Sequence, residues 1–100
     1  MDFEWDEAKR RTNILKHGID FADAIGVFES AFTESEDRRR VYGERRFLVT
    51  GELGGEILRI VYTQRGERCR IISARRARRD ERRAYHASDA GTGQANEKSN

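Results

Sequence analysis

The chain has 100 residues, enough for one small domain, and only 36% of them are hydrophobic. No apolar run approaches the length of a membrane span, and the stretch MDFEWDEAKR lacks the apolar centre of a signal peptide. We therefore expect a soluble protein of the cytoplasm, without membrane partners. The single cysteine, Cys69, excludes an internal disulfide and a cysteine-rich metal site, and its strand-like surroundings favour a buried, unreactive thiol.

Charge divides the sequence into an acidic and a basic part. Residues 1–37 contain ten acidic and four basic side chains, whereas residues 38–83 contain fifteen arginines, six acids and no lysine. Arginine stays charged at any working pH, and its planar group matches the geometry of phosphate. The basic part therefore predicts a phosphodiester ligand, most simply RNA, and the acidic part is suited to a basic partner.

The first third of the chain predicts a short strand followed by two helices. Residues 3–5 alternate aromatic and acidic side chains, as in a strand. Asp6 is a typical N-cap and Gly18 a typical residue after a helix end, so we expect a first helix between them. Asp20 is placed to cap a second helix, whose apolar face is formed by Phe21, Ala24, Ile25 and Phe28.

The middle of the chain changes to strand patterns. Residues 32–37 form a candidate edge strand, followed by a charged loop at 37–44. Glycine turns at residues 54–55 and 66 separate three further segments that read as strands. These segments predict a meander of strands at residues 46–52, 56–65 and 68–75.

The C-terminal part predicts one helix and a tail. One helical face carries Ala77, Glu81, Ala84 and Tyr85, and the other carries Arg78, Arg79, Arg82 and Arg83. Residues 88–100 have no large apolar side chain and are predicted to be a flexible tail, which leaves residues 1–87 as the domain. The expected fold is α+β, an antiparallel sheet with two N-terminal helices packed on one face and a C-terminal helix.

Two blocks, WDEAKRRTNILKHGIDF and RIISARRA, together with Glu81 and Tyr85, resemble the BrnT family of type II toxins over about residues 3–86. This resemblance implies cleavage of RNA.

Cleavage of RNA without a metal needs a base, an acid and cations that stabilise the phosphoryl oxygens. The basic part has no carboxylate cluster for two metal ions, so no metal or cofactor is expected. Arg75, where the last strand leads into the helix, is the first candidate cation, and Arg65 is the second. In a regular hairpin these two lie at different ends. Strand alternation places Arg75 with Ile71 and Ser73, and Arg76 with Ile72 and Ala74, but does not say which arginine faces the helices.

The candidate proton carriers are fewer and harder to separate from structural residues. His17 has a suitable pKa, yet a histidine before a glycine also commonly caps a helix end. Glu81 is a candidate catalytic group or the counter-ion of Arg75 or Arg78, and Tyr85 is a catalytic candidate or packs on the sheet. Lys9, Lys16, Glu44 and His86 are further candidates. The residues predicted to bind RNA are Lys9, Lys16, Arg46, Arg76, Arg78, Arg79, Arg82 and Arg83.

The resemblance to the BrnT family also implies a RelE-like ribonuclease fold and inhibition of translation by RNA cleavage. It also implies a BrnA-type antitoxin with a DNA-binding ribbon-helix-helix region, and repression of the operon by the two proteins at operator DNA. By analogy with RelE-like toxins, arginine and tyrosine at the sheet edge and last helix are catalytic candidates, and the ribosome is a candidate partner that orients the RNA.

Alternatives remain open from the sequence. A non-catalytic nucleic-acid-binding or co-repressor module would use the same arginines to touch phosphates without chemistry. An antitoxin-binding scaffold that has lost activity is a third reading. The mode of neutralisation is also open, because a basic antitoxin segment can lie on the acidic part of the chain or an acidic one can cover the arginines.

Overall fold

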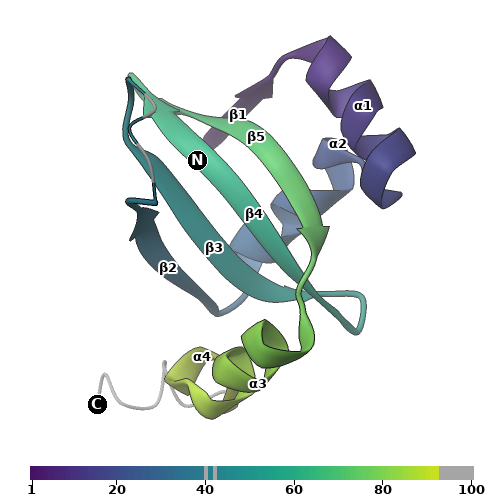
Figure 1. Cartoon of the computed structure of the whole chain (residues 1–100), viewed down its shortest axis with the longest axis vertical. Helices are drawn as coiled ribbons and strands as arrows, with labels where there is room; N and C mark the ends of the chain where they lie inside the picture. The colour runs from purple at the N-terminus through teal and green to yellow at the C-terminus, as the bar shows by residue number, and fades with distance from the viewer. Residues whose placement is uncertain (40, 42, 93–100) are drawn as a thin grey trace.

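Five strands form one sheet in the order β1-β5-β4-β3-β2, with helices at one face and one end (Figure 1). The structure is a computed structural model that describes residues 1–39, 41 and 43–92. The strands are β1 (Asp2–Trp5), β2 (Phe32–Asp37), β3 (Arg46–Leu53), β4 (Glu56–Arg65) and β5 (Arg68–Arg76). The helices are α1 (Glu7–His17), α2 (Phe21–Ala24), the 3-10 helix η1 (Ile25–Glu29), α3 (Arg79–Ala87) and α4 (Asp89–Thr92).

The predicted α+β class agrees with this arrangement, but the sheet is not wholly antiparallel. Strands β2 to β5 are antiparallel, as expected for a meander and its edge strand. Strand β1 instead pairs parallel with β5, with Phe3 opposite Cys69 and Trp5 opposite Ile71. The prediction was wrong here because the alternation in residues 3–5 identifies a strand but contains no signal for its direction.

The helix ends follow the predicted caps. The Asp6 side chain accepts a hydrogen bond from the Lys9 amide at 3.0 Å, and Gly18 ends α1 with a φ of 71°, a left-handed conformation that glycine adopts without strain. Asp20 caps α2 by accepting from the Ala22 amide at 2.9 Å. The second helix is shorter than predicted, because the chain tightens into η1 from Ile25 onward.

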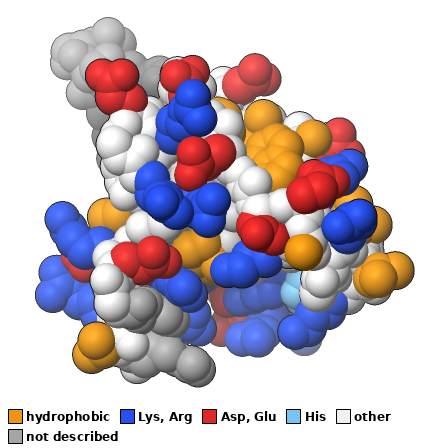
Figure 2. Space-filling view, turned by 90° about the horizontal axis from the view of Figure 1, so that it is seen from above, with side chains coloured by type: hydrophobic (Ala, Val, Ile, Leu, Met, Phe, Trp, Pro, Cys, Tyr) orange, Lys and Arg blue, Asp and Glu red, His pale blue; other side chains and the backbone are white. Residues whose placement is uncertain are grey.

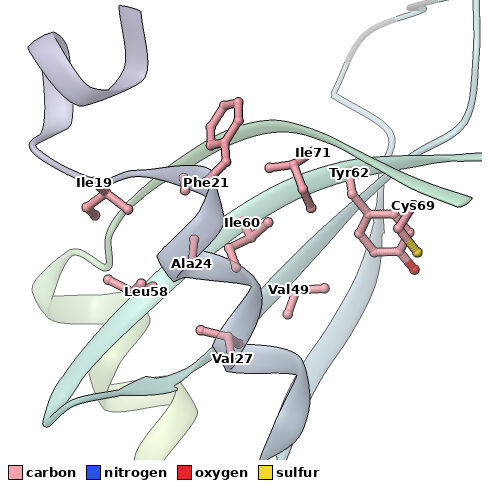
Figure 3. Close-up of a cluster of buried hydrophobic side chains, with 11 residues drawn as sticks. Ile19, Phe21, Ala24, Val27, Val49, Leu58, Ile60, Tyr62, Cys69 and Ile71 are labelled. Carbon is pink, nitrogen blue, oxygen red and sulfur yellow. The ribbon is translucent and has the colours of Figure 1, made fainter. Parts of the chain in front are cut away.

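The core lies between the sheet and the segment formed by α2 and η1 (Figure 3). Phe21, Ala24 and Val27 of this segment are fully buried, and Val49, Ile60 and Ile71 are among the sheet residues in the same cluster. Spacing of three residues is the period of a 3-10 helix, so Val27 takes the central position, and the predicted face residues Ile25 and Phe28 are only partly buried. Cys69 belongs to this core, and burial raises the pKa of its thiol, as expected for an unreactive cysteine.

A buried asparagine attaches α1 to the edge of β5. Strand β1 pairs with β5 only as far as Ile71, so the next part of that edge has no strand beside it. There the Asn13 amide nitrogen donates to the Ala74 carbonyl at 2.8 Å, and the Asn13 oxygen accepts from the Ala74 amide at 3.1 Å. The same nitrogen donates to the Ile19 carbonyl at 2.9 Å. The side chain of Asn13 thus replaces a strand as the partner of β5 and fixes the position of α1.

The C-terminal segment covers the lower end of the sheet in Figure 1. Tyr85 of α3 forms a small second core with Ile57 and Ala77, and Ala90 of α4 packs against it. The tail predicted from residue 88 therefore begins with a short helix, and residues 93–100 lie outside the described part. No helix in the described ranges is long and apolar enough to cross a membrane.

Replacing Asn13 by alanine should lower the free energy of unfolding by about 2–3 kcal/mol, because buried backbone groups of Ala74 and Ile19 lose their partners. Urea unfolding of the variant and the parent measures the change. Leu15→Ala on the same helix is the control. Since Leu15 is 89% exposed, its loss should change stability by less than about 0.5 kcal/mol. Equal effects of the two substitutions would contradict the proposed role of Asn13.

Candidate functional site

A β-bulge in β5 decides where the two arginines at its end point. Ser73 pairs with Val61 while Ile71 pairs with Tyr62, so Ile72 is an extra residue on β5. The bulge places Ile71 on the same side as Ala74, and both are buried in the core. The alternation predicted for residues 71–76 is therefore wrong across Ile72, because the pattern assumed a regular strand.

Arg75 and Arg76 consequently point to opposite faces of the sheet. Arg76 lies on the helical side, where it donates to the His17 carbonyl at 3.0 Å and to Glu56 at 3.1 Å. Arg75 pairs across the ladder with Arg59, on the open face, which is the side of the sheet opposite the core under α2 and η1. Figure 1 views the sheet with α1 and α2 at one side and the strands β2 to β5 uncovered over much of their length.

One carboxylate holds the two arginines of the open face. Arg75 makes a two-pronged ion pair with Glu81 of α3, at 2.8 and 2.9 Å, and Arg59 lies 3.5 Å from the same carboxylate. The Arg78 amide also donates to Glu81 at 2.8 Å. The Arg59 Nε atom is buried and has no hydrogen-bond partner among the described residues. We call Arg59, Arg75 and Glu81 the arginine cluster.

The charges in this cluster are strongly coupled. The hydrogen bond from Arg75 lowers the pKa of Glu81 from 4.5 to about 2, against burial, which acts in the opposite direction. The Arg78 amide and the charge of Arg59 contribute to the same lowering. Glu81 in turn raises the pKa of Arg75, while the nearby charge of Arg39 opposes that effect. Two arginines facing one carboxylate leave an excess positive charge suited to a phosphate.

The C-terminal end of α1 places His17 beside β5, next to the bulge residues Ile72 and Ser73. Burial is the main cause that lowers the pKa of His17 below 6.5, followed by the charges of Lys16 and Arg75. The imidazole is therefore neutral at neutral pH and able to accept a proton. His17, Lys9 and Lys16, three predicted site residues, line one hollow of about 350 Å³ with the bulge residues Ile72 and Ser73.

Arg65 lies apart from this region. It is at the far end of the β4–β5 hairpin, where it pairs with Arg68, as predicted for a regular hairpin. There Glu4 of β1 is shared by three arginines, with Arg70 at 3.0 Å, Arg68 at 3.7 Å and Arg65 at 4.0 Å. The structure thus separates the two arginines predicted to be catalytic into different clusters.

Tyr85 and the predicted arginines are distributed over several surfaces. Tyr85 is 5% exposed, donates to the Ala31 carbonyl at 3.1 Å and packs on the sheet end, so the structure does not bring it to Arg75. Arg82 donates to the Ala77 carbonyl, Arg46 pairs with Glu44, and Arg79 and Arg83 are exposed on α3. In Figure 2, Lys and Arg side chains gather along the lower side, and acidic and hydrophobic ones are interspersed above.

Sequence reasoning missed Arg59, Arg70 and Arg39. Arg59 and Arg70 lie inside the strand segments 56–65 and 68–75, in which the predicted site residues are only the arginines at the strand ends. The cross-strand position of Arg59 opposite Arg75 depends on the bulge, for which the sequence contains no recognisable signal. Within residues 1–39, 41 and 43–92, no three His, Cys, Asp or Glu side chains come together as a metal-binding set. Metal-free chemistry stays a prediction.

A family model described as "Ribonuclease toxin, BrnT, of type II toxin-antitoxin system" matches residues 5–81 of the chain. The chain belongs to this BrnT family of ribonuclease toxins. No curated protein sequence matches it. The match includes α1, the bulge, the arginine cluster and the first part of α3. Membership confirms the resemblance read from the sequence, and it implies an RNA substrate and an antitoxin partner for this BrnT protein.

Replacing Glu81 by glutamine should reduce the free energy of unfolding by about 1–3 kcal/mol at neutral pH, because Arg75 and Arg59 lose their counter-charge. The pKa of Glu81 is depressed in the folded state, so this stabilisation is present above pH 4.5 and is lost as the pH falls toward about 2. Urea unfolding over that range should show a smaller loss in the variant than in the parent. The expectation would be contradicted if the free energy of unfolding of the variant and of the parent changed in parallel with pH. It would also be contradicted if the exposed control Glu67→Gln lowered the free energy of unfolding as much as Glu81→Gln.

Proposed function

We propose that this BrnT protein is a metal-independent endoribonuclease whose site lies between the end of α1 and the open face of β4 and β5. The observation that carries the proposal is that Arg59 and Arg75 share one carboxylate. His17 lies at the end of α1 beside β5, and the charge of Arg75 is one of the causes that lower its pKa. Two fixed cations stabilise a phosphoryl group that gains charge, and a neutral imidazole accepts a proton. Together these groups supply most of what cleavage at a ribose 2′-OH requires.

The proposed reaction is an in-line displacement at phosphorus. His17 takes the proton of the 2′-OH, the 2′-oxygen forms a bond to the adjacent phosphorus, and the bond from phosphorus to the 5′-oxygen breaks. Arg75 and Arg59 stabilise the extra charge on the phosphoryl oxygens. Lys16, which lines the same hollow as His17, is the candidate that protonates the leaving 5′-oxygen. The products are a 2′,3′-cyclic phosphate and a 5′-hydroxyl end.

Glu81 acts in this scheme by positioning rather than by chemistry. Its carboxylate occupies one side of the Arg75 guanidinium and stays ionised at any working pH, since its pKa is about 2. A fixed guanidinium stabilises a transition state better than one that must first be ordered. The cluster at Glu4 of β1, at the other end of β4 and β5, offers Arg65, Arg68 and Arg70 to a further phosphate of the same RNA strand.

The biological consequences follow from RNA cleavage. We propose that the toxin acts in the cytoplasm, that it blocks translation by cleaving messenger RNA, and that the ribosome helps to orient the substrate. A BrnA-type ribbon-helix-helix antitoxin neutralises it, and the complex represses its own operon at operator DNA. An α+β domain with a RelE-like arrangement of sheet and helices is the fold expected for this activity.

Arg75→Lys and Arg59→Lys should each lower the rate of RNA cleavage by about a hundredfold or more, because lysine keeps the charge but loses the fork that fits phosphate. The measurement is cleavage of a defined RNA by purified protein in the presence of EDTA, with detection of the cyclic phosphate end. Induced expression of the parent should arrest bacterial growth and fragment RNA, and expression of the variants should not.

Arg11→Lys is the matched control, because Arg11 is exposed on α1 and should tolerate the change. Arg65→Lys, at the other cluster, should weaken substrate binding more than it slows the chemical step. Intact RNA with a folded, well-expressed parent would leave a nucleic-acid-binding module as the better account. Loss of activity with EDTA that returns with a divalent metal would overturn metal independence.

The pH profile tests His17. If the neutral imidazole is the base, kcat/KM should fall about tenfold per pH unit below the His17 pKa, which lies under 6.5, and should be flat toward neutral pH. His17→Asn should lower the rate by a hundredfold or more and remove this dependence. His86→Asn, at the far end of α3, should preserve it. An unchanged profile in His17→Asn would assign His17 a structural role only.

A further inference from the structure

Two hollows join along the outer side of η1, on the helical side of the sheet. The first, of about 780 Å³, runs from Met1 and Phe3 across α2 and η1. The second, of about 620 Å³, continues toward α4. Gly26, Glu29 and Leu53 line both, so the two form one continuous surface, which we call the η1 groove.

Hydrophobic side chains form the floor of the η1 groove. Phe3, Phe28 and Leu53 are only partly buried, and Met1 is 79% exposed. The rings of Phe3 and Phe28 pack against each other at a tilt of 44° with centroids 5.1 Å apart, and form the aromatic centre of the floor. Gly26 lets η1 approach β3 closely, since a Cβ there would lie 2.8 Å from the Leu53 side chain. Apolar surface of this kind, enclosed by polar residues, is typical of a protein interface.

The charged side chains that line the η1 groove are all acidic. They are Asp23 and Glu29 of the helical segment and Glu52 at the end of β3. Among the lining residues there is no lysine or arginine, although the whole sequence contains twenty. An apolar floor between carboxylates is complementary to an amphipathic segment with aliphatic or aromatic side chains flanked by lysine or arginine. A second copy would bring the same carboxylates against these, and like charges would repel.

We propose that the η1 groove is the anchoring surface for the antitoxin, through an amphipathic, basic segment of that partner. This rests on the proposed function in one respect, that the chain has an antitoxin. Of the two modes of neutralisation that the sequence leaves open, this proposal selects the one in which a basic antitoxin segment lies on the acidic part of the chain. The groove is on the helical side of the sheet and the arginine cluster is on the open face, so anchoring and catalysis use different residues.

The test measures binding of the purified antitoxin, encoded by the reading frame beside the gene for this chain, to the purified toxin by calorimetry. Asp23→Lys/Glu29→Lys should weaken Kd at least tenfold, and raising the salt concentration should weaken binding to the parent. Ala22→Arg, which adds a bulky cation at an exposed lining position, should have a similar effect. The RNA cleavage rate of each free variant should match that of the parent.

Glu67→Lys is the matched control, because it reverses the charge of an exposed glutamate in the β4–β5 turn, away from the groove. It should change Kd less than twofold. Unfolding curves verify that each variant is folded. An antitoxin that binds the Asp23→Lys/Glu29→Lys variant as tightly as the parent would overturn the proposal. So would an antitoxin that loses affinity only when Arg59 or Arg75 is changed, since that would mean direct cover of the arginines.

Two further outcomes separate this proposal from the proposed activity. A parent that binds the antitoxin with the expected loss in the groove variants, but cleaves no RNA, would retain the anchoring surface and reject the ribonuclease mechanism. A parent that does not bind the antitoxin at all would overturn the anchoring surface. Light scattering of the toxin alone measures whether it forms a dimer. A dimer that Glu29→Lys dissociates would overturn the proposal and assign the η1 groove to a second copy.

Discussion

The contact between Asn13 and Ala74 is the interaction on which the arrangement of the candidate site depends. The amide of Asn13 fills the place that a strand would take beside β5, and it does so from the middle of α1. Because α1 is rigid, fixing its middle also fixes its end, and that end carries His17 and Lys16. A second link, from Arg76 to the His17 carbonyl, ties the end of the helix to the end of the same strand. The side chain of Asn13 thus helps to place His17, the proposed proton acceptor.

The bulge at Ile72 is the second constraint, because it acts on the same stretch of β5. Without the extra residue, Arg75 would share a face with Ile71, which lies in the core, and would have to be buried among apolar side chains. With it, Arg75 reaches the open face opposite Arg59, and Arg76 reaches the helix. A defect in strand pairing therefore separates an arginine that can meet phosphate from one that supports the fold.

Much of the fold was predictable because its signals are local. The caps at Asp6 and Asp20, the glycine after α1 and the turns of the meander each depend on a few neighbouring residues, and all appear in the structure. The direction of β1, the tightening of η1 and the bulge depend on contacts far apart in the sequence. The missed bulge also hid part of the candidate site. Arg59 lies opposite Arg75 because of the strand register, and the positions of the two residues in the sequence do not reveal that pairing. Arg75 and Arg78 were both predicted as partners of the Glu81 side chain, and the guanidinium of Arg75 is the one that pairs with it. Both candidates are within six residues of Glu81, so this prediction also depended on a local signal.

The arginine cluster has a property that a surface of scattered arginines lacks. Guanidinium groups placed opposite each other on neighbouring strands repel, and the fold supplies one carboxylate to hold them, on a helix that continues directly from β5. A single glutamate neutralises only one of the two charges, so the cluster is ordered before any ligand arrives and still attracts an anion. A basic module that merely touched phosphates would gain little from such order, because exposed arginines bind phosphates without it. Preorganisation matters most where charge develops during a reaction, which is why the geometry of Glu81, Arg75 and Arg59 favours catalysis over binding alone.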